Sequence, residues 1–124
     1  MITGIEHVAI AAADPARLAQ WYAEVLGFVI VYNSGRTFFV RAPDGSMIEI
    51  ISAEGPREYH TMKDPGLRHI ALAVKDFSGV YEKLRAAGVK FITEPSDSKG
   101  VKVVFFEDPE GNYLHLIERE TPLG

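Results

Sequence analysis

The sequence contains no cysteine. This absence excludes disulfide bonds, a thiolate nucleophile, and zinc or iron–sulfur sites with Cys ligands, so any bound metal must be held by nitrogen and oxygen atoms. Basic runs are also missing, and thirteen Lys and Arg against seventeen Asp and Glu give a formal charge of −4. Because nucleic-acid binding depends on clustered positive charge, we do not expect a nucleic-acid partner.

Long apolar stretches are absent as well. The apolar runs have the length of single strands, and residues 1–6 lack the basic region and apolar run of a secretory signal. We therefore expect no membrane contact and a cytoplasmic protein. The 124 residues, 47% of them hydrophobic, are enough for one ordinary domain with a buried core.

The chain contains an internal repeat. Residues 4–11 match residues 66–73 at an offset of 62, and residues 43–50 match residues 109–116 at an offset of 66. Matching blocks in the same order indicate a duplicated unit. We expect a single domain, 1–124, made of a first module at about 1–52, a linker at about 53–65 and a second module at about 66–120.

Each module is predicted to have the order βαβββ. Asp14 and Asp76 are natural N-caps, and each following helix has an amphipathic stripe that ends near a glycine, Gly27 or Gly88. We expect an α+β fold in which the two modules form one curved, eight-stranded mixed sheet around a metal cavity, with one helix per module on the convex face. The predicted strands are 5–11, 28–32, 37–41 and 47–51 in the first module and, after the equivalent of 5–11, 89–92, 101–106 and 113–117 in the second.

Strand alternation places four polar side chains at repeat-equivalent positions. His7 and His69 lie on the faces of their strands that also carry small alanines, and Glu49 is the repeat equivalent of His115. One histidine on a strand is usually a satisfied core residue. Four such groups beside small residues favour a cavity that holds a divalent metal, since imidazole and carboxylate donors suit Zn, Ni, Co, Fe(II) or Mn.

The chain resembles the vicinal oxygen chelate superfamily, the group of glyoxalases, bleomycin-resistance proteins and extradiol dioxygenases. The resemblance covers essentially the whole chain and is carried by HVAI at 7–10, WYAEVLGF at 21–28, GLRHIALAV at 66–74 and FEDPEGN at 106–112. It implies that His7, Glu49, His69 and His115 are the metal ligands. Glyoxalase I carries a glutamate at the position of His115. Glu118 falls on the opposite face of its strand and is read as a solvated carboxylate.

The resemblance implies a glyoxalase-like lyase or isomerase that acts on a small substrate with vicinal oxygens through a metal-stabilised enediolate. Glu49 is then the proton carrier, and His115 a ligand or alternate base. An Fe(II)-dependent extradiol-type dioxygenase, a thiol or water addition of the fosfomycin-resistance kind, and a metal-free bleomycin-resistance-like binding protein remain alternatives.

Weaker signals mark further residues. Arg41, Glu107 and Tyr113 are candidate substrate contacts, although Arg41 and Glu107 can equally pair across the sheet. His60 is expected on the surface of the linker. Because a curved sheet of this size leaves edges unpaired, we also expect a homodimer.

Overall fold

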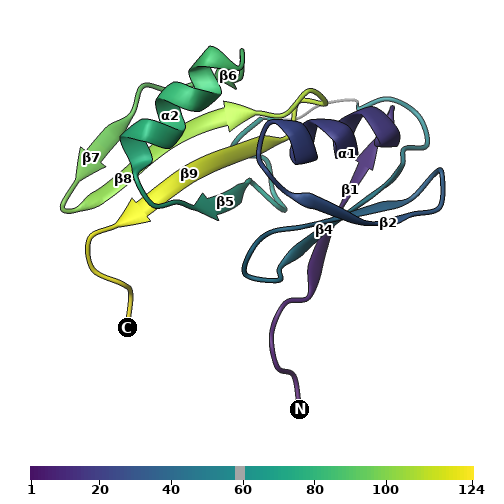
Figure 1. The fold of residues 1–124 in the computed structure, drawn as a ribbon, viewed down its shortest axis with the longest axis horizontal. Helices are drawn as coiled ribbons and strands as arrows, with labels where there is room; N and C mark the ends of the chain where they lie inside the picture. Colours follow the sequence, from purple (N-terminus) through teal and green to yellow (C-terminus); the bar gives the residue numbers. More distant parts are fainter. Residues whose placement is uncertain (58–60) are drawn as a thin grey trace. The chain divides into compact units, whose positions relative to one another are not determined.

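A computed structural model describes residues 1–57 and 61–124 of the chain (Figure 1). The chain divides into two compact units, Met1–Glu58 and Tyr59–Gly124. The point of division falls within the linker expected at about 53–65. No helix among the described residues is long and apolar enough to cross a membrane.

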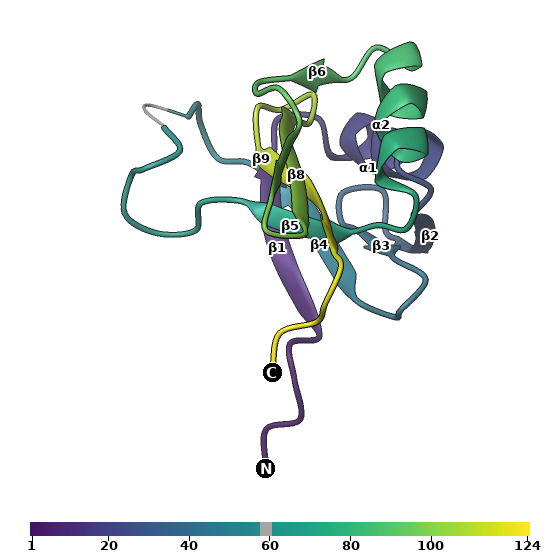
Figure 2. The same cartoon turned by 90° about the vertical axis from the view of Figure 1, so that its left-hand side faces the viewer.

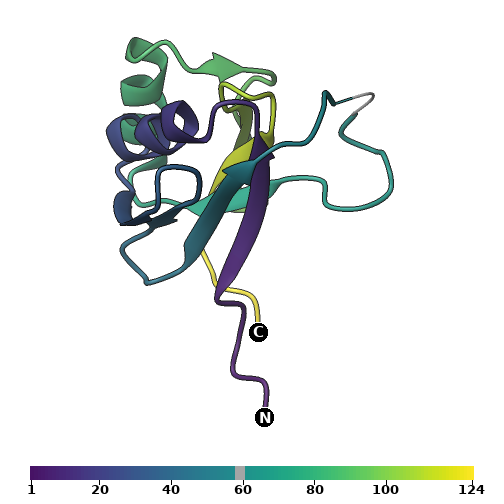
Figure 3. The same cartoon turned by 90° about the vertical axis from the view of Figure 1, so that its right-hand side faces the viewer.

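The first unit is a four-stranded sheet covered on one side by a helix. Its strands are arranged in the order β1-β4-β3-β2, with β1 parallel to β4 and the other neighbours antiparallel. Figure 3 shows α1 beside β1 and β4, on one side of the sheet. The elements are β1 (His7–Ala12), α1 (Pro15–Glu24), β2 (Val29–Asn33), β3 (Phe38–Arg41) and β4 (Met47–Ser52).

Local sequence explains why α1 begins and ends where it does. The side chain of Asp14 accepts a hydrogen bond from the backbone N–H of Arg17 at 3.2 Å, and Pro15 occupies the first turn, where its missing N–H has no consequence. Leu18 and Tyr22 are fully buried against the sheet. Burying each such side chain stabilises the fold by about 1.5–3 kcal/mol. The residues of the sheet that face this helix are Ile10, Ala12, Phe38, Val40, Ile48 and Ile50.

The second unit repeats this arrangement with one added strand. Its strands follow the order β5-β9-β8-β6, with β5 parallel to β9, and β7 forms an additional antiparallel pair with β8. Figure 2 shows α2 on one side of the strands of its own unit. The elements are β5 (Ile70–Ala73), α2 (Phe77–Ala86), β6 (Lys90–Phe91), β7 (Ser96–Ser98), β8 (Val101–Glu107) and β9 (Tyr113–Arg119).

Two carboxylates hold the start of α2. Asp76 has the left-handed conformation, with φ 59°, and its side chain accepts from the N–H of Gly79. A Cβ at Gly79 would overlap the Asp76 carboxylate, so a larger residue there would push this carboxylate away from its capping position. Glu118 of β9 accepts from the N–H of Phe77 at 3.0 Å. Glu118 is thus on the face opposite to His115, as alternation predicted. It is not a solvated carboxylate, because it caps the helix.

The βαβββ order is confirmed in the first unit, and the second unit departs from it. The expected single eight-stranded sheet is not what forms: the described residues make one sheet of four strands and another of five. The additional strand arises because Lys99 and Gly100, both with positive φ, turn the chain so that Ser96–Ser98 pairs with Val101–Val103. Strand β6 is also shorter than predicted, with only Lys90 and Phe91 paired to β8.

Candidate metal centre

In the described part of the chain, each sheet has one face that no helix of its own unit covers. Along β1, buried Ile10 and Ala12 alternate with exposed His7, Ala9 and Ala11, so the histidine lies on the uncovered face. The same alternation in β9 puts Tyr113, His115 and Ile117 on one face and buried Leu114 and Leu116 on the other. The larger apolar side chains therefore meet the helices, as predicted.

In the first unit, the uncovered face brings His7 and Glu49 together. The His7 Nε2 atom lies 3.7 Å from Glu49 Oε1, and the two side chains are 36% and 26% exposed. The other ring nitrogen of His7, Nδ1, lies 2.8 Å from an oxygen of Glu6. Phe39, directly opposite Glu49 on β3, packs edge-on against the His7 ring with centroids 5.3 Å apart. A carboxylate at Nδ1 holds the ring so that Nε2 faces Glu49.

In the second unit, the corresponding face brings two histidines together. The ring centroids of His69 and His115 are 4.4 Å apart, and Phe105 packs against both rings at 5.3 Å and 4.8 Å. His115 is buried. The Nδ1 atoms of His69 and His115 are both buried with no hydrogen-bond partner in the described part of the chain. Buried polar atoms normally have a hydrogen-bond partner, so these two nitrogens are exceptional. They are therefore candidate donors to a bound metal ion.

Burial also controls the protonation of this pair. It lowers the pKa of His115 from the usual 6.5 to about 4, with smaller contributions from the nearby His69, Arg68 and Arg119. The pKa of His69 is lowered as well, first by burial and then by the positive charge of Arg68. His115 is therefore neutral at pH 7, which is the state in which imidazole binds a metal.

The strand registers show that the two pairs are structural equivalents. On β4, Glu49 is flanked by Ala9 and Phe39, and on β9, His115 is flanked by Ala71 and Phe105. The edge-on contact of His7 with Phe39 recurs between His69 and Phe105 at the same 5.3 Å. The repeat in the sequence thus reappears as one local geometry built twice, with a carboxylate at one position and an imidazole at the other.

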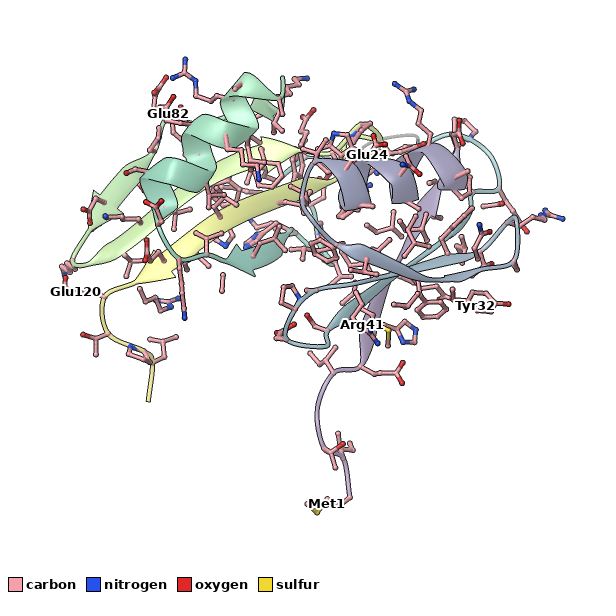
Figure 4. The ribbon with its side chains drawn as sticks, viewed as in Figure 1. Met1, Glu24, Tyr32, Arg41, Glu82 and Glu120 are labelled. Atoms are coloured by element: carbon pink, nitrogen blue, oxygen red, sulfur yellow. The ribbon has the colours of Figure 1, made fainter. Side chains whose placement is uncertain are left out.

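The weaker candidates fall in different surroundings. Glu107 on β8 forms an ion pair with Lys90 on β6 at 3.1 Å. This is the pairing across the sheet that the sequence offered as the alternative to a substrate contact. Arg41 is exposed and forms no ion pair with the described residues, and Figure 4 shows it on the side of the strands away from α1. Tyr113 is half-buried on the same face as His115. His60 lies outside the described residues.

Sequence reasoning missed the residues that support the two pairs. Phe39 and Phe105 lie opposite Glu49 and His115, and these places follow only once the strand register is known. Glu6 and Arg68 each precede one of the repeated histidines in the chain. No residue pattern distinguishes such side chains from ordinary solvated charges.

Both pairs fit the chemistry of a divalent metal. Two donors bound to one ion at about 2.1 Å lie roughly 3.0–3.4 Å apart, so the 3.7 Å between His7 and Glu49 requires only a small side-chain adjustment. In the second unit, the corresponding candidate donors are the unpartnered Nδ1 atoms of His69 and His115. Among the described residues, no group of three or more His, Asp or Glu side chains is close enough to hold an ion together.

Comparison with known proteins gives concordant results. Residues 4–116 match the family model described as the Glyoxalase/Bleomycin resistance protein/Dioxygenase superfamily. A relative from Synechocystis sp., named as a probable lactoylglutathione lyase, is 30% identical over 93% of this chain and 95% of its own length.

Two solved structures have the same fold. A glyoxalase family protein from Enterococcus faecalis aligns with a TM-score of 0.80 and 28% identity, over 94% of this chain and 98% of that one. A protein titled oxidase ChaP-H2 aligns with a TM-score of 0.77 and 25% identity, over 100% of this chain and 98% of its own.

Proposed function

Because this chain belongs to the glyoxalase/bleomycin resistance protein/dioxygenase superfamily, we propose that it is a metal-dependent, glyoxalase-like lyase or isomerase. Its substrate is a small molecule with two vicinal oxygens. The similarity to a protein named as a probable lactoylglutathione lyase supports this reaction class. The observation that carries the proposal is the pair of repeat-equivalent donor sets, one of which has two buried nitrogens without a partner.

The proposed ligands are His7 and Glu49 from the first unit and His69 and His115 from the second. We propose that these residues are ligands of a divalent ion, which is Zn, Ni, Co, Fe(II) or Mn on the basis of its nitrogen and oxygen donors. The neutral state of His115 at pH 7 supports its role as a ligand, because no proton has to be displaced.

The chain's own residues then move the proton. A divalent ion held by the proposed ligands would act as a Lewis acid towards the two vicinal oxygens of the substrate. Glu49 would take the proton from one substrate carbon and return it to the neighbouring carbon, while the hydroxyl proton passes from one vicinal oxygen to the other, so the reaction is an isomerisation without net gain or loss of atoms. His115 is a ligand or, where its ring does not bind the ion, the alternate base, since a neutral ring has a single basic lone pair at pH 7. Phe39 lies directly opposite Glu49 on β3, and its ring packs against His7.

A second candidate is an Fe(II)-dependent dioxygenase or oxidase. The structural similarity to a protein titled an oxidase, at 25% identity, favours it. Glu49 and two of the three histidines would supply the two imidazoles and one carboxylate that such an iron site uses. The third histidine would then occupy a position that dioxygen or substrate needs, which is why isomerase chemistry is placed first.

Metal content is the direct test of the ligand set. Purified protein should bind one equivalent of Ni, Co or Zn per chain, and the variants His7→Ala, His69→Ala and His115→Ala should each lose most of it. The matched control is His60→Ala, which removes the one histidine outside the proposed set and should leave the metal content unchanged. Equal metal content in all four variants would show that these residues do not form the site and would favour a metal-free binding protein.

Activity distinguishes the two reactions. Isomerisation of the methylglyoxal–glutathione hemithioacetal with Ni, Co or Zn supports the glyoxalase-like reaction. Dioxygen consumption on a catechol with Fe(II) supports the second candidate instead. If the metal-loaded protein does neither, the proposed reaction class is wrong even where the ligand set is right.

We also propose that the protein is a homodimer. Among the described residues, the outer edges of β1 and β5 pair with no strand, and the repeat-equivalent side chains Ile5 and Leu67 are 84% and 81% exposed. Unpaired edges with exposed apolar side chains favour association. Sedimentation at micromolar concentration should give twice the monomer mass, and a monomer at that concentration would contradict the proposal.

A further inference from the structure

The residue before each repeated histidine has the opposite charge in the two units. Glu6 precedes His7, and Arg68 precedes His69 at the same place in the repeat. The Glu6 carboxylate has a hydrogen-bond partner within the protein, since one of its oxygens lies 2.8 Å from His7 Nδ1. The role of Arg68 cannot be the same, since a guanidinium has no acceptor for an imidazole N–H.

Arg68 is held in place by two contacts. Its Nε atom donates a hydrogen bond to the backbone oxygen of Met62 at 2.9 Å, and its Cζ atom lies 5.4 Å from the centre of the Phe105 ring. Phe105 is the ring that also packs against His69 and His115. The guanidinium therefore lies beside the histidine pair, in an orientation set by its stacked ring and its Nε bond.

The two terminal nitrogens of Arg68 remain available. The side chain is exposed, and it forms no ion pair with a carboxylate of the described residues. The other stacked arginine of this unit differs in this respect: Arg85 lies over Tyr81 with its Cζ at 5.6 Å from the ring centre, and it also pairs with Glu82 at 3.5 Å. A planar guanidinium with both terminal nitrogens available matches the two oxygens of a carboxylate or phosphate.

We propose that Arg68 binds an oxyanion, the carboxylate or phosphate group of a small-molecule substrate, beside His69 and His115. This inference rests on the proposed function in that it names the substrate class of the same site: the substrate carries a negatively charged group in addition to its vicinal oxygens. Arg68 then determines specificity and positions the substrate, while proton transfer belongs to other residues. The negative charge of the bound group also offsets the repulsion between Arg68 and any ion held by the two histidines.

The first experiment measures anion binding without catalysis. Inorganic phosphate and acetate are titrated into the full chain, both as purified and after removal of metal with a chelator. The readout is the NMR signals of the Arg68 side chain and of the His69 and His115 rings. We expect saturable binding in both forms, and Arg68→Gln should weaken it at least tenfold, because hydrogen bonds to charged groups contribute more than neutral ones. Arg68→Lys keeps the charge and loses the planar guanidinium. Its anion affinity should lie between those of the unaltered chain and Arg68→Gln.

The matched control is Arg85→Gln, which removes an exposed, ring-stacked arginine from the same unit and should leave anion binding unchanged. Equal affinity in the Arg68→Gln and Arg85→Gln variants would overturn the proposal, as would the absence of saturable binding in the unaltered chain. Binding that disappears after metal removal would also overturn it, since the anion would then be held by the metal.

Metal content of the same variants separates this inference from the proposed function. Arg68→Gln should keep its full metal equivalent while losing the anion, because the guanidinium is not a ligand. If the unaltered chain holds no metal but binds phosphate through Arg68, the metal-dependent function fails and the anion site remains. If it holds metal but Arg68→Gln binds phosphate normally, the anion site fails and the metal site remains.

Discussion

The imidazole rings of His69 and His115 lie with their centroids 4.4 Å apart and their planes inclined at 59°, and neither buried Nδ1 atom has a hydrogen-bond partner in the part of the chain that the structure describes. Two imidazolium cations so close would repel each other strongly. This pair is therefore stable only when at least one ring is neutral, and its protonation links the fold to pH.

We expect the metal-free protein to lose stability as the pH falls from about 6.5 to about 4. Burial holds the pKa of His115 at about 4 in the folded chain, below its usual 6.5. Between these values the unfolded chain binds a proton that the folded chain does not, so the stability is fully present above the higher pKa, declines with falling pH, and levels off below the lower one. The loss is on the order of 3 kcal/mol.

Urea unfolding in the presence of a chelator, at several pH values across this interval, measures the effect. His115→Gln should remove most of the pH dependence, and His60→Gln should keep it. An equally steep dependence in His115→Gln would assign the effect to other groups.

Metal should stabilise the fold against heat. Saturation with Zn or Ni to about 100 times the dissociation constant should add about 2.7 kcal/mol to the free energy of unfolding, because the ion binds the folded chain in preference to the unfolded one. A thermal melt with and without a chelator detects this as a shift in Tm. The shift should disappear in His69→Ala and persist in His60→Ala, and its persistence in both would place the metal elsewhere.

Glu49→Gln tests the proton carrier. The amide keeps the shape of the side chain but cannot accept a proton, so turnover should fall by roughly 10²–10⁴-fold while the fold is unchanged. Metal content is measured on the same sample, because a weakened ligand and a lost base must be told apart. If Glu49→Gln keeps both its metal and its activity, Glu49 is not the proton carrier, and this role would be assigned to His115.

Glu6→Ala should weaken metal binding without removing a ligand. The Glu6 carboxylate at 2.8 Å from His7 Nδ1 orients the ring and raises the basicity of Nε2. Loss of such a partner commonly lowers metal affinity by about 10–100-fold. Competition with a chromophoric chelator measures the affinity, with the exposed Glu54→Ala as control. Identical affinities in the two variants would show that Glu6 has no such role.

Glu118→Ala should destabilise the protein by about 1 kcal/mol and leave its metal content intact. The side chain caps α2 through the N–H of Phe77 and lies on the face opposite to His115. Denaturant unfolding measures the change against Glu94→Ala, which removes an exposed carboxylate of the same unit. Loss of metal in Glu118→Ala would mean that its carboxylate acts on the site.

The repeat and strand alternation predicted much of this arrangement. They placed His7 with the alanines of its strand, made Glu49 and His115 equivalent, and directed Glu118 to the other face, because each depends only on local periodicity. Strand β7 was missed because Ser-Asp-Ser has no apolar alternation, and its pairing depends on the turn at Lys99 and Gly100.

The contacts of single charged side chains were beyond sequence reasoning for a different reason. Glu107 pairs with Lys90, and Arg68 stacks on Phe105. These contacts require the register of strands and loops far apart in the chain, and a charged residue in the sequence gives no indication of which neighbour it will meet. The Glu118 cap on α2 is of the same kind, since 41 residues separate it from Phe77.

The difference between the edge strands β2 and β7 has a practical consequence for handling the protein at high concentration. Strand β2 ends the first sheet with exposed Val29, Val31 and Tyr32, whereas β7 borders β8 with the exposed, polar Ser96, Asp97 and Ser98. A β-edge with apolar side chains is a template for growth by strand addition, and a short polar edge resists it. Aggregation during storage should therefore begin by strand addition at β2. Val31→Lys should slow this aggregation.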